Sequence, residues 1–386
     1  MKLWLSLLYE EFDVLFKDSV KKQLVSDVPI GVLLSGGIDS SIIAYYAANF
    51  SKNVKTFNVS FKKFGDFDES SHARLVSQFL GTDHIEIDID EPSPDLMFKL
   101  SKQFDEPISD SSMIPTFLLS REVKKYCTVA LGGDGGDELF GGYKHYDRLL
   151  WLEKYLSKLP NNIKKFISTN ITEKLPIGFK GKNWLQSLDT DLSNNLPIIG
   201  KFFSQNDRNK LTNNLLNLNF SENFWNERLP KENDLLERAT RMDFKNYLAE
   251  DILVKIDRAS MLNSLELRAP FLDKKIIEFA FGKVHPKNKC SSNERKIFLK
   301  KFVYKIFPKS FDIKRKQGFS IPLKNWFKKG KWRDLLTDTL LDSESFFNKE
   351  IVENIIKQHD KGYNNSERLF CLLNFELWRK YYKLSI

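Results

Sequence analysis

The sequence contains little of the chemistry on which disulfide frameworks and protein-built metal sites depend. Its 386 residues include only three cysteines and five histidines. Cys127, Cys290 and Cys371 are far apart and form no metal-ligand spacing, so they predict reduced, buried thiols. His72 and His84 each lack a metal partner at a suitable spacing. These absences exclude a disulfide framework and give no support to a catalytic thiol.

Long hydrophobic runs are also missing. No stretch approaches the roughly 18 consecutive apolar residues of a membrane-spanning helix. The first residues, MKLWLSLLYEEFD, carry one lysine, a short apolar run and then acids. A signal peptide has a more basic start, a longer apolar core and a small-residue cleavage site. We therefore expect an amphipathic first helix in a cytoplasmic protein without a membrane partner.

Positive charge is present in excess but is not clustered. The chain has 60 basic and 51 acidic residues, which gives a formal net charge of +9. The lysines are spread along the sequence without a long basic run, whereas a nucleic-acid site has a clustered basic footprint. A polyanionic small-molecule substrate explains the charge better, and we do not expect a nucleic-acid partner.

Apolar strands alternate with helical stretches in the first third of the chain. The candidate strands end near residue 34 or cover 54–61, 84–89 and 127–131. Strands separated by helices predict a parallel sheet with helices on both faces. The expected fold class is therefore α/β.

The rest of the chain reads differently. Residues 150–235 are rich in Leu, Phe, Lys and Asn and carry no recognisable chemical motif. We expect an α/β core over 1–149, a helical insertion over 150–235, and a mostly helical part over 236–386 that completes the active site. Asp273 precedes an apolar helical pattern and is predicted to be its N-cap.

One apolar run breaks at a glycine turn. Residues 31–44 read GVLLSGGIDSSIIA, in which a buried strand leads into Ser35-Gly36-Gly37 and then a helix that starts near Asp39 or Ser40. Glycines allow close approach to the backbone, and the free N–H groups of a helix start attract anions. The stretch predicts an anion site, although it lacks the lysine of the GxxxxGK[ST] phosphate loop.

A second glycine-rich turn follows the fourth predicted strand. The stretch ALGGDGGDELFGGYKHY at 130–146 places carboxylates beside its glycines. Ligands of parallel sheets bind beyond the carboxyl ends of the strands, so we expect both glycine turns to converge on one pocket. Carboxylates beside a nucleotide can hold Mg²⁺ or deprotonate an amine.

The string SGGxDS resembles the pyrophosphate loop of the N-type ATP pyrophosphatases, and both motifs together resemble the C-terminal synthetase domain of the asparagine synthetase family. Six blocks carry the resemblance in order: SDVPIGVLLSGGIDSSIIA, FDESSHARLVSQFLGTDH, DEPISDSSMIP, GGDGGDELFGGY, KIDRASMLNSLELRAPFLD and KRKQGFSIP. The resemblance implies that ATP adenylates a carboxylate, most directly the β-carboxylate of aspartate, with release of pyrophosphate. Ammonia then forms the amide and displaces AMP.

The resemblance also implies roles for individual residues. Asp39 and Asp137 match Mg²⁺ ligands. Lys316 matches the basic residue whose positive charge neutralises the negative charge that develops on the phosphates. Asp134 matches an acidic position linked to adenylate formation and to the later amine step, where well-known members carry the longer glutamate. The residues implied to hold ATP and its pyrophosphate are Leu34, Ser35, Gly36, Gly37, Asp39, Ser40, Val59, Gly132 and Gly133.

Two further polar groups stand in the matching blocks. DEPISDSS brings Asp105, Glu106 and Asp110 near the expected substrate amino acid, although Asp110 and the following serines equally fit a helix cap. A buried polar scaffold is expected from Lys255, Asp257, Arg258, Glu266 and Arg268.

Alternatives stay open for the acceptor and for the nitrogen source. The same chemistry could act on a sugar carboxylate in surface-polysaccharide biosynthesis, or serve a tRNA-modifying ATP pyrophosphatase. Glutamine-hydrolysing members of the family begin with a Cys nucleophile, whereas this sequence begins Met1-Lys2-Leu3 and reaches its glycine turn at residue 35. We expect free ammonia as the nitrogen source, with a separate glutaminase subunit as an open alternative.

Overall fold

The computed structural model divides into two compact units, a sheet unit and a helical unit. The structure describes residues 2–51, 54–60, 70–156, 158–215, 220–308, 311 and 321–385. The sheet unit consists of Met1–Asp90, Ser112–Leu150 and Ala239–Ser320. The helical unit consists of Glu91–Ser111, Trp151–Arg238 and Ile321–Ile386.

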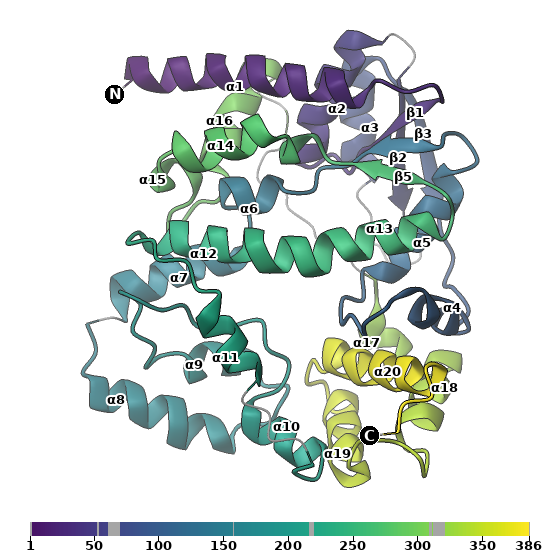
Figure 1. Ribbon diagram of the computed structural model, residues 1–386, viewed down its shortest axis with the longest axis vertical. Coiled ribbons are helices and arrows are strands. Elements are labelled where there is room, and N and C mark those ends of the chain that lie inside the picture. The colour runs from purple at the N-terminus through teal and green to yellow at the C-terminus, as the bar shows by residue number, and fades with distance from the viewer. Residues whose placement is uncertain are drawn as a thin grey trace. The chain divides into compact units, whose positions relative to one another are not determined.

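A five-stranded parallel sheet, in the order β3-β2-β1-β4-β5, lies in the sheet unit (Figure 1). Its strands are β1 (Ile30–Leu33), β2 (Lys55–Ser60), β3 (Asp83–Asp88), β4 (Val129–Leu131) and β5 (Glu266–Arg268). The first four correspond to the predicted strands, and the parallel α/β fold is confirmed.

The edge strand β5 was not expected from the sequence. It has only three residues and lies in a stretch interpreted as part of a buried polar scaffold. That interpretation is wrong for Asp257 and Glu266, which are exposed. Glu266 begins the edge strand, where a side chain can face solvent. It is right for Lys255, which is buried.

The sheet unit also contains helices, two of which extend along the chain into the helical unit. They are α1 (Lys2–Gln23), α2 (Ile38–Phe50), α3 (Ser70–Leu80), α5 (Met113–Val123), α6 (Gly136–Phe140), α7 (Lys144–Tyr155), α12 (Leu235–Asp243), α13 (Leu253–Met261), α14 (Lys274–Gly282), α15 (Pro286–Lys289) and α16 (Ile297–Ile306). The π-helical segment Phe244–Ile252 joins α12 to α13, and Figure 1 shows them as one continuous run. α2 contacts β1, α3 contacts β2 and β3, and α13 contacts β5.

The helix α1 is the amphipathic first helix that the sequence predicts. Phe12, Phe16 and Val20 recur at i, i+4 and i+8 and are fully buried, whereas Leu3 and Val14 are exposed. None of the described helices combines the length and the apolar character that a membrane crossing requires.

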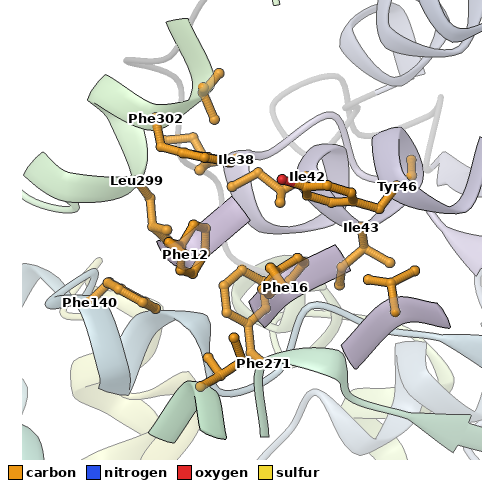
Figure 2. Close-up of a cluster of buried hydrophobic side chains, with 14 of the residues drawn as sticks. Phe12, Phe16, Ile38, Ile42, Ile43, Tyr46, Phe140, Phe271, Leu299 and Phe302 are labelled. Carbon is orange, nitrogen blue, oxygen red and sulfur yellow. The ribbon is translucent and has the colours of Figure 1, made fainter. Parts of the chain in front are cut away.

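A core rich in aromatic side chains joins α1, α2, α6 and α16 (Figure 2). The rings of Phe12 and Phe302 meet edge to face with centroids 4.8 Å apart, and Phe140 stacks on Phe298 at 5.7 Å. Ile42 of α2 lies in the same cluster and is fully buried. Because aromatic pairs of this kind prefer defined geometries, the core fixes how the ends of these helices lie with respect to one another.

The helical unit has no strand among its described residues. Its helices are α4 (Leu96–Gln103), α8 (Asn161–Phe166), α9 (Lys182–Gln186), α10 (Gln205–Leu211), α11 (Phe220–Glu227), α17 (Leu323–Trp326), α18 (Lys331–Leu340), α19 (Lys349–Asp360) and α20 (Ser366–Tyr381). α4 and α20 contact each other, and Asn374 of α20 accepts a hydrogen bond from Ser101 of α4 at 2.9 Å. The division into 1–149, 150–235 and 236–386 stays a prediction.

Candidate functional site

The two glycine turns leave neighbouring strands of the sheet. β1 and β4 pair in parallel with Val32 opposite Leu131, so the loops that follow them begin side by side. The chain places β2 and β3 on one side of β1, and β4 and β5 on the other. The order of the strands therefore reverses between β1 and β4, where parallel sheets of this type bind their ligands.

Hydroxyl groups hold the first turn in shape. The Ser35 N–H donates to Ser40 Oγ at 3.3 Å, and the Gly37 N–H donates to Ser35 Oγ at the same distance. Ser40 Oγ in turn donates to the Gly37 carbonyl at 3.2 Å. The turn is thus pre-formed by its own side chains before any ligand binds.

Gly36 is required by the geometry of this turn. Its φ of 74° lies in the left-handed region, and a Cβ atom there would be 2.7 Å from the backbone nitrogen of Ala73 in α3. A side chain at this position would therefore meet both conformational strain and a backbone clash. The glycine lets α3 pack directly against the turn.

The residues expected around the nucleotide base are buried at the ends of β1 and β2. The Leu34 N–H donates to the Phe57 carbonyl at 2.7 Å, and Leu34 is buried in the core of the sheet unit. Val59 is buried on β2 and pairs with Ile87 of β3. Both residues have apolar side chains near the carboxyl ends of their strands. Their contact with adenine stays a prediction.

The second turn approaches the start of α2. A Cβ atom on Gly133 would lie 3.1 Å from the Asp39 Cβ, and one on Gly136 would lie 2.8 Å from the Asp39 carboxylate. Gly132 donates its N–H to the Arg268 carbonyl of β5 at 2.8 Å. The turns at 35–37 and 132–136 therefore converge, as the sheet topology suggested.

The carboxylates of Asp39 and Asp137 both contact one cation, the ammonium group of Lys296. Asp39 lies in the first turn of α2, Asp137 lies in α6, and Lys296 immediately precedes α16. The Lys296 Nζ donates to Asp39 Oδ2 and lies 2.7 Å from Asp137 Oδ1. Burial alone would lower the pKa of this ammonium group, but Asp137 and Asp39 outweigh the burial and hold its pKa above the ordinary value. Lys296 is therefore charged.

The sequence did not point to Lys296. It is 257 residues away from Asp39 and belongs to neither glycine motif. Its only local signal, a charged residue before an apolar helical pattern, is typical of a solvated helix start. The structure instead buries its side chain.

This carboxylate pair fits Mg²⁺. Two carboxylate oxygens already converge on one positive charge, and Mg²⁺ is commonly bound by one or two carboxylates together with phosphate oxygens. The described residues include no group of three or more His, Cys, Asp or Glu side chains placed to hold a metal ion. Asp39 and Asp137 are the candidates for holding Mg²⁺ together with a phosphorylated ligand.

Asp134 lies in a different setting from Asp137. Burial raises the pKa of its carboxyl group, while the Lys255 ammonium group opposes that rise. Lys255 reaches this region from α13 and donates to Ser112 Oγ at 2.8 Å, at the start of α5. A carboxylate with a raised pKa is a better proton acceptor than one with an ordinary pKa, which suits a general base.

Glu138 forms a second buried acid next to the metal candidates. Its Oε1 accepts the hydrogen bond of the Tyr143 hydroxyl, and its Oε2 has no hydrogen-bond partner among the described residues. Burial raises the pKa of Glu138 to about 8, against the lowering effect of the Tyr143 hydrogen bond. Burial and then the charge of Glu138 raise the pKa of Tyr143, which keeps it a neutral donor.

Other candidates fall outside this cluster. Lys316 lies outside the described residues, so its predicted contact with phosphate stays a prediction. Asp105, Glu106 and Asp110 belong to the helical unit, and their place beside a substrate also stays a prediction. The Ser112 side chain accepts the hydrogen bond of Lys255 and does not cap α5.

The three thiols are free, as the sequence predicts. Burial raises the pKa of Cys127 to about 11 and that of Cys290 to about 12. Burial also raises the pKa of Cys371, whose thiol accepts a hydrogen bond from Ser109 at 3.1 Å. Thiols of this kind stay protonated at neutral pH and are poor nucleophiles.

Comparison with known proteins identifies the family. The model of the asparagine synthase family matches residues 11–380. A Bacillus subtilis (strain 168) protein, asparagine synthetase [glutamine-hydrolyzing] 1, is 32% identical over 94% of this chain. A putative asparagine synthetase [glutamine-hydrolyzing] of Mycobacterium bovis is 30% identical over 96% of it. The chain spans 57% of the length of each of these relatives. On these matches the chain belongs to the asparagine synthase family.

Proposed function

We propose that this chain uses ATP and Mg²⁺ to convert a carboxylate into an amide, with aspartate as the acceptor and ammonia as the nitrogen donor. In the first step the β-carboxylate oxygen attacks the α-phosphorus, and the bond to pyrophosphate breaks. In the second step ammonia attacks the activated acyl carbon, AMP leaves, and a proton is lost. The products are asparagine, AMP and pyrophosphate.

One observation carries the proposal. The turns after β1 and β4 converge so that Asp39 and Asp137 contact the same cation beside the helix start that carries the SGGIDS string. Convergent carboxylates next to a helix N-terminus suit a magnesium-bound polyphosphate. Membership of the asparagine synthase family supports the same chemistry.

The residues divide the work according to their chemistry. The N–H groups and hydroxyls at Ser35, Gly37 and Ser40 would exchange their hydrogen bonds to one another for bonds to the departing phosphates and keep them oriented. Asp39 and Asp137 would hold Mg²⁺, which supplies charge stabilisation to the phosphate oxygens when bound. Lys316 would add a second positive charge to the same group, according to the family resemblance.

Asp134 is proposed to take the proton lost when ammonia attacks. Burial raises the pKa of Asp134, which makes it a stronger proton acceptor than an ordinary aspartate. Gly132 leaves room for this carboxylate, because a Cβ atom there would lie 2.8 Å from Asp134 Oδ2. The turn can therefore hold an acid close to its own backbone.

The test measures AMP release from ATP by the purified chain with Mg²⁺ and each candidate acid. We expect aspartate to trigger AMP and pyrophosphate release, and asparagine to form when an ammonium salt is added. A uronic-acid nucleotide and transfer RNA serve as competing acceptors. AMP release that depends on either of them, and not on aspartate, would overturn the choice of acceptor and retain the adenylation chemistry.

A further inference from the structure

Lys296, whose side chain contacts the two carboxylates, has an uncommon backbone conformation. Lys296 has a φ of 53°, in the left-handed region that non-glycine residues rarely adopt, and its N–H donates to the Gly141 carbonyl at 3.3 Å. Its side chain is 7% exposed. Buried lysines with strained backbones are retained where the surrounding structure requires them, which often marks functional sites.

The surrounding chain makes room for this contact. A Cβ atom on Gly142 would lie 1.7 Å from Asp137 Oδ1 and 2.3 Å from Lys296 Cε. No larger residue at position 142 is therefore compatible with the observed arrangement. Gly142 leaves room for both the amine and the carboxylate.

The ammonium group of Lys296 and a divalent cation would need the same oxygen atoms. Lys296 Nζ contacts Asp39 Oδ2 and Asp137 Oδ1, which belong to the two carboxylates that the proposed function gives to Mg²⁺. Two positive groups held against the same pair of partly buried carboxylates would repel each other, because charge interactions are stronger there than in bulk water. The amine and the metal ion therefore exclude each other at this position.

We propose that Lys296 is an exchangeable occupant of the metal position: its ammonium group holds Asp39 and Asp137 together in the metal-free protein and leaves when a divalent cation binds. The proposal rests on the proposed function for the identity of the metal position. It adds that the metal must compete with a built-in cation, so the free protein binds Mg²⁺ weakly.

Release of the lysine links the metal to the nucleotide. A displaced buried ammonium group needs a new anion, and the turn at 35–37 lies beside Asp39, where phosphates are proposed to bind. A pyrophosphate group there would give the amine a new partner and the metal two or more further oxygen ligands. Metal and phosphate thus strengthen each other's binding, a coupling that is reciprocal by thermodynamic necessity.

A static ion pair is the competing explanation. In that case Lys296 only holds α16 against α2 and α6, and its loss would loosen the carboxylates and weaken metal binding. The two explanations predict opposite changes in metal affinity when the positive charge is removed.

The experiment measures Mn²⁺ binding to the nucleotide-free protein, by the paramagnetic resonance signal of the free ion. We expect Lys296→Met to bind Mn²⁺ at least about tenfold more tightly than the wild-type protein, because the competing charge is gone. Lys301→Met, which removes an exposed lysine from the same helix, should bind as the wild type does. Pyrophosphate should raise the Mn²⁺ affinity of the wild type more than that of Lys296→Met. Equal or weaker Mn²⁺ binding by a folded Lys296→Met protein would overturn the proposal.

A measurement on the wild type covers the case in which Lys296→Met does not fold. Acylation of Lys296 by an amine-reactive reagent, followed by peptide mass spectrometry, should accelerate severalfold when Mn²⁺ saturates the site, while Lys301 reacts at an unchanged rate. Unchanged Lys296 labelling would overturn the exchange. Neither result depends on AMP formation, so the exchange can fail while Mg²⁺-dependent AMP release, and with it the proposed function, stands.

Discussion

Gly142 lies so close to Asp137 that a Cβ atom on the glycine would be 1.7 Å from Oδ1 of the carboxylate. The same Cβ would be 2.3 Å from Cε of Lys296. This glycine is therefore needed for packing around the charged cluster. It gives a way to disturb the carboxylate pair without changing any charged residue.

Gly142→Ala should displace Asp137 and lower the rate of AMP release by about 10²-fold or more, the usual effect of losing one preorganised charge stabiliser. The overpacking should also lower the free energy of unfolding by about 1–3 kcal/mol. Gly282→Ala is the matched control, because nothing lies within 4 Å of a Cβ at that helical position. Rates and stabilities of the two variants are compared by AMP assay and urea unfolding. A Gly142→Ala protein with wild-type activity would show that Asp137 is not held in its working position by this packing.

Asp39→Asn should abolish AMP release while the fold is retained. The substitution removes the negative charge of an acid that contacts the Lys296 cation and that is proposed to hold Mg²⁺. Asp18→Asn, on the exposed face of α1, is the matched control. Circular dichroism verifies the fold, and AMP is measured at saturating ATP. If Asp39→Asn released pyrophosphate at nearly the wild-type rate, Asp39 would have only a structural role at the start of α2.

Glu138 should make the stability of the protein fall as the pH rises from about 5 to about 8. Its pKa is raised from 4.5 to about 8 in the folded protein, chiefly by burial. Between these values the folded state binds a proton that the unfolded state has lost, so unfolding releases it and becomes easier as the pH rises. The contribution is at most about 1.4 kcal/mol per pH unit.

The variant Glu138→Gln has no such proton and should gain stability relative to the wild type over this window. Guanidinium unfolding at several pH values, in metal-free buffer, measures the difference. Glu278→Gln, an exposed glutamate on α14, is the control and should follow the wild-type curve. Parallel pH profiles for Glu138→Gln and the wild type would show that the buried carboxyl group is already ionised at pH 5.

Signals within a few residues were sufficient to predict much of the fold. Asp273 was expected to cap a helix, and its Oδ1 accepts the Lys275 N–H at 2.8 Å at the start of α14. The four predicted stretches lie in the observed sheet, because β1 and β4 are apolar runs and β2 and β3 have apolar residues at alternate positions. The strand β5 reads Glu-Leu-Arg, with one apolar residue between two charged ones, and so lacks such a pattern.

Only part of the candidate site could be predicted from the sequence, because sequence signals are local. Asp39 and Asp137 stand in glycine-rich strings whose composition is unusual by itself. The role of Lys296 follows only from its contacts with Asp39 and Asp137, which are distant in sequence. The aromatic core of α2, α6 and α16 brings these residues together. The core uses ordinary apolar periodicity, so nothing in the sequence around Lys296 distinguishes it from a solvated lysine.

Asp134→Asn should separate the two steps of the proposed reaction. If Asp134 accepts the proton from ammonia, its loss slows asparagine formation by about 10²-fold or more, while aspartate-dependent exchange of pyrophosphate into ATP continues. Asp134→Glu should keep both activities, since family members carry glutamate at the matching position. Equal loss of exchange and of asparagine formation in Asp134→Asn would assign Asp134 to adenylation instead.

The nitrogen source gives the last prediction. We expect this chain alone to make amide from an ammonium salt and not from glutamine. Release of ammonia from glutamine by a thiol needs a reactive thiolate, and burial raises the pKa values of Cys127, Cys290 and Cys371. The rate with ammonium should rise with pH, because only the unprotonated amine can attack.

Purified protein is supplied with ATP, Mg²⁺, aspartate and either nitrogen source, and asparagine and AMP are measured. Substantial synthesis from glutamine by this chain alone would contradict the prediction. Synthesis from glutamine that starts only when a second protein is added would instead identify a separate glutaminase subunit.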